Sequence, residues 1–167
     1  GLGCFARFRG MWGLVIFGNV KRTAVLSRDR LGIKPLYLWR TDGLVAVASE
    51  IKQFLEVPGF QRKANPATCA LYLLTGYEEP MGSFFRDVQQ VPPGCWQTVD
   101  VDSLKIDSPE AYWKPERLQP EIDDPVEAGQ LFAEKLAESV KLHLRSDVPV
   151  GCALSGGGPR GAAGRLQ

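Results

Sequence analysis

Short apolar stretches bounded by turn residues characterise the N-terminal half of the chain. Residues 14–17 and 23–27 are apolar or β-branched and flank a segment containing glycine and asparagine, which predicts a β-hairpin. Residues 35–40 and 44–48 repeat this pattern around a Thr-Asp-Gly turn, where the glycine can supply a positive φ. Two consecutive hairpins predict a sheet-rich region.

Two short helices and a further strand are expected after the hairpins. Ser49 is placed to cap a helix over 50–56. Asn65 followed by proline combines a capping residue with proline at the first helical position, which predicts a helix over 66–74. Residues 94–101, entered through a Pro-Pro-Gly turn, alternate enough to predict a strand.

A proline-rich stretch separates this sheet-rich domain, assigned to residues 1–107, from an amphipathic segment. Prolines and charges are frequent between Ser108 and Pro125, as is typical of an interdomain linker, which we place at 108–123. Asp124 then caps a helix whose apolar residues recur with a 3.6-residue period. The residues of that apolar face are Ala128, Leu131, Phe132, Leu136, Val140 and Leu144.

A predicted strand and a glycine loop follow this helix. The apolar run Val148–Leu154 predicts a buried parallel strand that leads into Ser155-Gly156-Gly157. Helix, strand and glycine loop are typical of the start of an α/β domain, which we assign to 124–157. Residues 158–167 are a low-complexity tail that cannot form a core. Because the chain opens on glycine and both ends are abrupt, we interpret it as an internal piece of a longer protein.

Composition narrows the possible partners. The chain has 167 residues, of which 44% are hydrophobic and 23% charged, as in ordinary globular proteins. Its net charge of +1 gives no electrostatic reason to expect nucleic acid or a membrane surface as a partner. The widely spaced cysteines form no CxxC pair, and the single histidine, His143, argues against a zinc site. We expect no metal site and a reduced, cytoplasmic protein.

Two loops carry candidate chemistry. Ser155-Gly156-Gly157 could present backbone N–H groups to a phosphate, although glycines after a strand also serve as a plain tight turn. The second loop runs from Ser27 to Tyr37. Its Arg28-Asp29 pair could fix the bend through charge-assisted hydrogen bonds to the backbone, or the loop could be a solvated hairpin connection. Gly32 permits a backbone conformation closed to other residues. The residues alone leave both alternatives open for each loop.

Other conspicuous side chains have structural interpretations. His143 lies near the end of the amphipathic helix, where its charge favours the helix C-terminus. The aromatic residues near the N-terminus, Phe5, Phe8, Trp12 and Phe17, are expected in a core. The cysteines are expected as small buried side chains rather than nucleophiles; they are Cys4, Cys69, Cys95 and Cys152.

An ordered series of motifs resembles the glutamine-hydrolysing asparagine synthetases of the bacterial type. The resemblance covers residues 1 to about 157. Its Arg-Asp-x-x-Gly-x-x-Pro-Leu element is shared across class II glutamine amidotransferases, whereas the later Asp-Val-Pro-x-Gly-x-x-Leu-Ser-Gly-Gly element points to the synthetase. The motifs are Cys4–Trp12, Arg28–Tyr37, Ala48–Lys52, Val91–Gly94, Tyr112-Trp113 and Arg145–Gly157.

This resemblance implies an α+β chain with parts of two domains. Residues 1–107 would be the latter part of an N-terminal-nucleophile hydrolase, an αββα sandwich of antiparallel sheets that releases ammonia from glutamine. Residues 124–157 would be the first helix and strand of an α/β PP-loop ATP pyrophosphatase domain, which uses ATP and Mg²⁺ to adenylate aspartate. The nucleophilic cysteine would precede residue 1, so no catalytic residue is expected here. Roles in ATP binding carry over to Leu154, Ser155, Gly156 and Gly157.

The end of the chain departs from the family pattern. The family continues its glycine loop with an acidic residue and a serine, where this chain has Pro159 and Arg160, and neither of these can ligate Mg²⁺. We therefore expect the isolated chain to run neither half-reaction. Two alternatives remain open. One is a piece of a related ATP-dependent amidotransferase, β-lactam synthetase-like or peptidoglycan-modifying. The other is a non-catalytic module that binds an intact partner; a homodimer is also possible.

Overall fold

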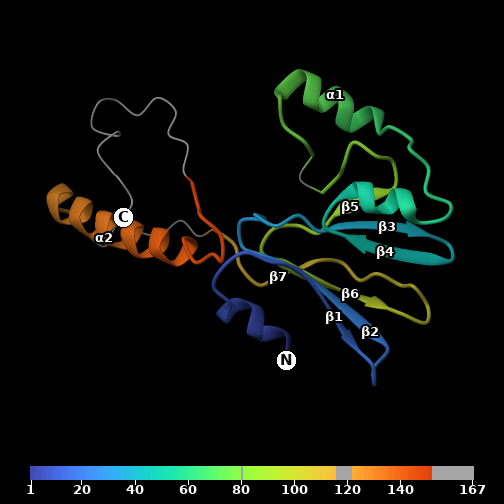
Figure 1. The fold of residues 1–167 in the computed structure, drawn as a ribbon, viewed down its shortest axis with the longest axis horizontal. Coiled ribbons are helices and arrows are strands. Elements are labelled where there is room, and N and C mark those ends of the chain that lie inside the picture. Colours follow the sequence, from blue (N-terminus) through green and yellow to red (C-terminus); the bar gives the residue numbers. More distant parts are fainter. Residues whose placement is uncertain (80, 116–121, 152–167) are drawn as a thin grey trace. The chain divides into compact units, whose positions relative to one another are not determined.

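The computed structural model describes residues 1–79, 81–115 and 122–151, and it is a mixed α+β structure with two antiparallel sheets (Figure 1). The chain divides into two compact units, Gly1–Arg117 and Leu118–Gln167, which are described separately here. Within the described residues, no helix is long and apolar enough to cross a membrane.

The first sheet has four strands in the order β1-β2-β6-β7. They are β1 (Gly13–Gly18), β2 (Thr23–Arg28), β6 (Cys95–Asp100) and β7 (Glu110–Ala111), and each pair of neighbours is antiparallel. The expected hairpin over 14–27 is confirmed as β1 and β2. Strand β7 lies in the stretch that we expected to be linker, so the first residues of that stretch belong to the sheet.

The second sheet has three strands in the order β4-β3-β5. They are β3 (Tyr37–Thr41), β4 (Leu44–Ala48) and β5 (Val88–Gln90). The second expected hairpin is confirmed as β3 and β4, paired from Tyr37 opposite Ala48 to Thr41 opposite Leu44. Strand β5 was not predicted from the sequence.

A hydrophobic core joins the inner faces of the two sheets. Leu26 of β2 and Val99 of β6 pack in one cluster with Leu38 of β3, and each of the three is at most 4% exposed. Because successive side chains of a strand point to opposite faces, Trp39 faces away from this cluster. It packs with Phe54 and Val88 in a second core on the outer face of the three-stranded sheet. The two clusters make the three-stranded sheet a central layer.

Capping explains the short helices, with one correction to the sequence prediction. The 3₁₀ helix η2 (Ile51–Glu56) is capped by Glu50, not by Ser49, because Glu50 and Gln53 form a reciprocal capping box. Helix α1 (Pro66–Thr75) is confirmed, and the Asn65 side chain accepts from the Thr68 N–H at 3.5 Å. A further 3₁₀ helix, η1, spans Leu2–Arg7.

The aromatic residues near the N-terminus differ in burial. Phe5 is 1% exposed and packs against Phe8 and Tyr112. Phe17, by contrast, is 51% exposed on the edge strand β1. The prediction that Phe17 lies in a core is therefore wrong, because no described strand pairs with the outer edge of β1 and no described element covers Phe17.

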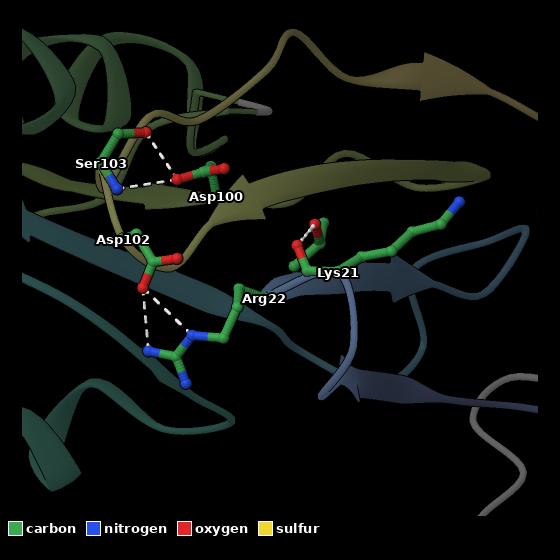
Figure 2. A network of polar contacts seen from close by, with 6 residues as sticks. Lys21, Arg22, Asp100, Asp102 and Ser103 are labelled. Carbon is green, nitrogen blue, oxygen red and sulfur yellow. Dashed lines mark hydrogen bonds and ion pairs between the residues drawn. The ribbon is translucent and has the colours of Figure 1, made fainter.

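An exposed polar network ties two turns of the four-stranded sheet together (Figure 2). Arg22, in the β1–β2 turn, donates to one Asp102 carboxylate oxygen from Nε at 3.1 Å and from Nη2 at 2.9 Å. Asp100 accepts from both the N–H and the hydroxyl of Ser103 at 2.7 Å, and these bonds hold the pKa of Asp100 below its usual range. Exposed ion pairs of this kind contribute little to stability.

The second unit contains one long described helix, α2 (Pro125–His143). Its N-cap is as predicted, because Asp124 Oδ1 accepts from the Val126 N–H at 3.0 Å. The apolar face, however, is exposed within the described residues: Phe132 is 67% exposed and Leu136 50%. Residues 148–151 are not part of a strand, and the rest of the expected strand lies outside the described residues.

Candidate functional site

The residues assigned to ATP binding lie outside the described part of the chain. These are Leu154, Ser155, Gly156 and Gly157, and the departures from the family pattern at Pro159 and Arg160 lie there too. Their roles stay predictions. The second candidate loop, from Ser27 to Tyr37, is fully described, and its chemistry can be read from its contacts.

Asp29 organises that loop from a buried position. It is 1% exposed, and its carboxylate accepts four backbone N–H groups. Oδ1 accepts from Leu31 at 3.1 Å and Ile33 at 3.0 Å, and Oδ2 accepts from Lys34 at 3.0 Å and Trp12 at 3.2 Å. Burial by itself raises the pKa of Asp29, but these four donors outweigh it and hold the pKa below its usual value.

Arg28 complements Asp29 by binding carbonyl oxygens. Its Nε donates to Lys34 O at 3.0 Å, and Nη2 donates to Gly32 O at 2.8 Å. Nη1 donates to Val91 O at 3.1 Å and to Gln90 Oε1 at 3.0 Å. Burial lowers the pKa of Arg28, and the neighbouring Asp29 charge opposes that shift. The guanidinium thus links the loop to the three-stranded sheet.

Gly32 is required at its position. Its φ is +65°, and a Cβ there would lie 2.8 Å from Pro93 Cγ and 3.0 Å from Arg28 Cζ. Both the backbone conformation and the space therefore exclude a side chain.

The loop is also tied to the N-terminal segment and to Tyr112, which follows β7. Arg30 donates from Nη1 to Phe8 O at 2.7 Å and from Nη2 to Ala6 O at 2.8 Å. The Tyr112 hydroxyl donates to Arg28 O at 2.7 Å, and burial raises the pKa of Tyr112 to about 12. These bonds connect parts of the chain that are far apart in sequence.

The arrangement supports a structural role rather than acid–base chemistry. Each Asp29 oxygen already accepts two hydrogen bonds, so the carboxylate has no oxygen left over for a substrate proton or a metal ion. Of the two alternatives, the structure confirms the one in which Arg28 and Asp29 fix the bend through hydrogen bonds to the backbone. We call this unit, Arg28 to Lys34, the Arg28–Asp29 turn.

The described cysteines and carboxylates form no metal or nucleophile site. In the part of the chain that the structure describes, no group of three or more His, Cys, Asp or Glu side chains could hold a metal ion. Cys4, Cys69 and Cys95 are free, partly buried thiols, and burial raises the pKa of Cys95, which disfavours the reactive thiolate. Cys152 lies outside the described residues.

Sequence reasoning missed a cavity between the two sheets. It has a volume of about 380 Å³ and is lined by residues from both sheets, among them Leu38 of β3, Gln90 of β5 and Gln97 of β6. The position of Gln97 could have indicated this cavity. Gln97 lies two residues before the core residue Val99 in β6, so both side chains point to the same, inward face of the sheet. A polar residue at such a position indicates either a buried hydrogen bond or a polar cavity.

Comparison with known proteins gives two family matches in chain order. Residues 1–113 match the glutamine amidotransferase domain, and residues 131–157 match asparagine synthase.

Individual relatives cover most of this chain but little of their own length. The chain is 33% identical over 161 residues to a Methanocaldococcus jannaschii protein provisionally named glutamine-hydrolysing asparagine synthetase 2 (94% of this chain, 30% of the relative). It is 32% identical to the amidase chyE of Penicillium rubens (94% and 23%), and 31% identical to glutamine-hydrolysing asparagine synthetase 2 of Bacillus subtilis (94% and 22%). The chain thus spans less than a third of these relatives.

Proposed function

Because the chain belongs to the glutamine amidotransferase domain family and continues into the start of an asparagine synthase domain, we propose that it is the junction of these two domains in a glutamine-hydrolysing asparagine synthetase. The observation that carries this proposal is the order of the two matches along one chain. Relatives named as such synthetases in Methanocaldococcus jannaschii and Bacillus subtilis each match 94% of this chain, which supports the same assignment.

The proposed parent reaction couples two half-reactions. Hydrolysis of the glutamine side-chain amide releases ammonia, and aspartate reacts with ATP to give aspartyl-AMP and pyrophosphate. Ammonia then displaces AMP to give asparagine. In this assignment residues 1–107 are the latter part of an N-terminal-nucleophile αββα sandwich. Residues 124–157 then begin the PP-loop domain.

The described residues would act in this enzyme as framework. The Arg28–Asp29 turn fixes the end of β2 against β5 and the N-terminal segment, and its buried carboxylate is already saturated with backbone donors. Backbone N–H groups of Ser155, Gly156 and Gly157, next to Leu154, would bind ATP phosphate. Pro159 and Arg160 supply no carboxylate, so the chain's own residues do not fit the Mg²⁺ that accompanies ATP.

A second candidate function follows from the amidase relatives. The proteins named amidase chyE and amidase chry2 are 32% and 30% identical to this chain, each matching 94% of it. Their similarity favours a wider class of enzymes that share the amidotransferase domain but act on a different amide. The acceptor substrate would distinguish the two functions.

A chimera with the Bacillus subtilis relative tests the proposal. Residues 1–113 of this chain replace the matching segment of that synthetase, and glutamine-dependent and ammonia-dependent asparagine formation are measured separately. We expect both activities to persist, because the graft supplies only amidotransferase framework. If ammonia-dependent synthesis persists while glutamine hydrolysis is lost, residues 1–113 are not equivalent to that domain.

A second chimera tests the departures at the glycine loop. One graft extends to residue 157 and keeps the acidic residue and serine of the Bacillus subtilis relative. The other extends to residue 160 and replaces them with Pro159 and Arg160. We expect ATP–pyrophosphate exchange to survive the first graft and to be lost in the second. The isolated chain is expected to show neither glutaminase activity nor this exchange, and turnover in either assay contradicts that expectation.

A further inference from the structure

The first turn of α1 (Figure 1) contains a buried hydroxyl without a hydrogen-bond partner. Thr68, the third residue of this ten-residue helix, is 1% exposed, and its Oγ1 bonds to no described residue. At this position a polar side chain usually accepts from the N–H of the N-cap residue. Here that N–H is already committed, because Asn65 donates it to Phe84 O at 2.8 Å. The hydroxyl is therefore left for a group from outside the helix.

The same turn also has a free backbone donor. The first N–H groups of a helix have no partner within the helix. Pro66 has no N–H, and the Thr68 N–H reaches the Asn65 side chain only at 3.5 Å. The N–H of Ala67, an exposed residue, donates to no described group. Because helix side chains tilt toward the N-terminus, the Thr68 hydroxyl points to the end at which these donors lie.

Two cations face each other beside this turn. Ala64 and Phe85 form an isolated antiparallel bridge. Their neighbours Lys63 and Arg86 therefore lie opposite each other, and the Arg86 N–H donates to Lys63 O at 2.8 Å. Alternation places both side chains on the same face as that of Asn65. Both cations are exposed, and neither forms an ion pair within the described residues. Like charges placed directly opposite each other are destabilising, and an anion bound between them would remove the repulsion.

We propose that Lys63, Arg86 and the first turn of α1 bind a phosphate group, either as free phosphate or on a small monoester. The positive end of the helix dipole and the two side-chain cations supply the charge that attracts a dianion. The Ala67 N–H and the Thr68 hydroxyl supply hydrogen-bond donors. To reach the buried hydroxyl, the anion would displace the Asn65 side chain, whose cap is weak at 3.5 Å. The proposal does not depend on the function proposed above, because it uses no residue of the ATP loop.

Titration of the isotope-labelled chain with inorganic phosphate at constant ionic strength tests the site, with the Ala67 N–H followed by NMR. We expect a saturable shift of that resonance, and about fivefold weaker binding in Lys63→Gln and in Arg86→Gln. Arg62→Gln is the matched control and should bind phosphate as the wild type does. It removes the same charge from the neighbouring residue, whose side chain alternation places on the other face. No saturable shift, or equal weakening by Arg62→Gln, overturns the proposal.

Thr68→Val separates a binding site from a purely structural turn. Valine has nearly the shape of threonine and removes the buried oxygen that has no partner. The midpoint of urea denaturation without phosphate should therefore stay the same or rise. Phosphate binding should nevertheless weaken about threefold, because one donor is lost. A Thr68→Val chain that binds phosphate as tightly as the wild type contradicts the role assigned to the hydroxyl.

A second probe identifies the source of the phosphate group. Glycerol 3-phosphate carries the same dianion on a small polar alcohol, so the tighter of the two probes shows whether a free ion or a monoester is the better ligand. Binding of either supports the site. Chloride at the same ionic strength should give no saturable shift of the Ala67 resonance. An equal saturable shift with chloride would indicate a general ionic effect and overturn the proposal.

Discussion

The Arg28–Asp29 turn and the cavity between the sheets place polar side chains in different surroundings. In the turn, the Asp29 carboxylate accepts from four backbone N–H groups, and the Arg28 guanidinium donates to three carbonyl oxygens and one amide. The Gln97 side chain, 7% exposed, lines the cavity instead of bonding to a described residue. A fully satisfied polar network rigidifies a fold, whereas an amide at a cavity surface can be hydrated and adds no such rigidity.

The largest effect is expected from Asp29→Asn. The amide has one acceptor oxygen, and its NH₂ group would face N–H donors. Two of the four hydrogen bonds would therefore be lost and replaced by contacts between donors. We expect the free energy of unfolding to fall by about 3–5 kcal/mol, measured by urea denaturation. Asp102→Asn is the matched control: this carboxylate is 64% exposed, and its loss should leave the denaturation midpoint unchanged. Equal effects of both variants would contradict the contrast between satisfied burial and surface pairing.

The same carboxylate sets a pH dependence. The folded-state pKa of Asp29 lies below its unfolded value of about 3.9, so the folded chain favours the ionised form. Its contribution to stability is therefore fully present above about pH 3.9 and is lost as the pH falls through the folded pKa. Asp29→Asn should remove this part of the acid transition, which urea denaturation from pH 6 to pH 2 measures.

Gly32→Ala is expected to have the next largest effect. The added Cβ meets Pro93 and Arg28 at 3.0 Å or less, and the φ of +65° strains any side chain. We expect a loss of at least about 2 kcal/mol in the free energy of unfolding. Gly43 has no atom within 4 Å of its position for a Cβ and no positive φ, so Gly43→Ala should be close to neutral. A neutral Gly32→Ala would show that the turn is less constrained than its contacts indicate.

Tyr112→Phe tests how the turn is held to the segment that follows β7. Loss of the hydrogen bond to Arg28 O should cost about 1 kcal/mol near neutral pH. Because the folded-state pKa of about 12 exceeds the unfolded value of about 10, the phenol stabilises the fold fully below about pH 10, and this stabilisation is lost as the pH rises through about 12. Thermal unfolding between pH 8 and 12 should show this loss in the wild type and not in Tyr112→Phe. Tyr77→Phe, at a 77% exposed position, is the control.

Gln97→Leu is expected to have the smallest effect and the opposite sign. Gln97 is 7% exposed and precedes the core residue Val99 by two positions, so an apolar side chain of similar size there should raise the free energy of unfolding by up to about 1 kcal/mol, as measured by urea denaturation. A loss of stability would mean that the Gln97 amide contributes more than the apolar contacts of a leucine, which contradicts the expected sign.

Sequence patterns predicted the long, regular elements well. Both hairpins, the helix after Asn65 and the helix after Asp124 appear where alternation, turn residues and caps placed them. The three-residue β5 and two-residue β7 were missed, because strands that short have no detectable period and exist only by pairing with β3 and β6. The exposure of Phe17 was also missed, because composition shows that a side chain is apolar but not whether another element covers it.

The sequence by itself determined the family membership and the two hairpins, because these follow from local backbone preferences and from motifs contiguous in the chain. The structure decided that position 32 requires glycine, through its φ of +65° and the approach of Pro93. Only the tertiary structure decided that Asp29 is saturated with hydrogen bonds while Gln97 is not. Their difference depends on the backbone N–H groups that the folded loop and Trp12 bring within about 3 Å of the Asp29 carboxylate.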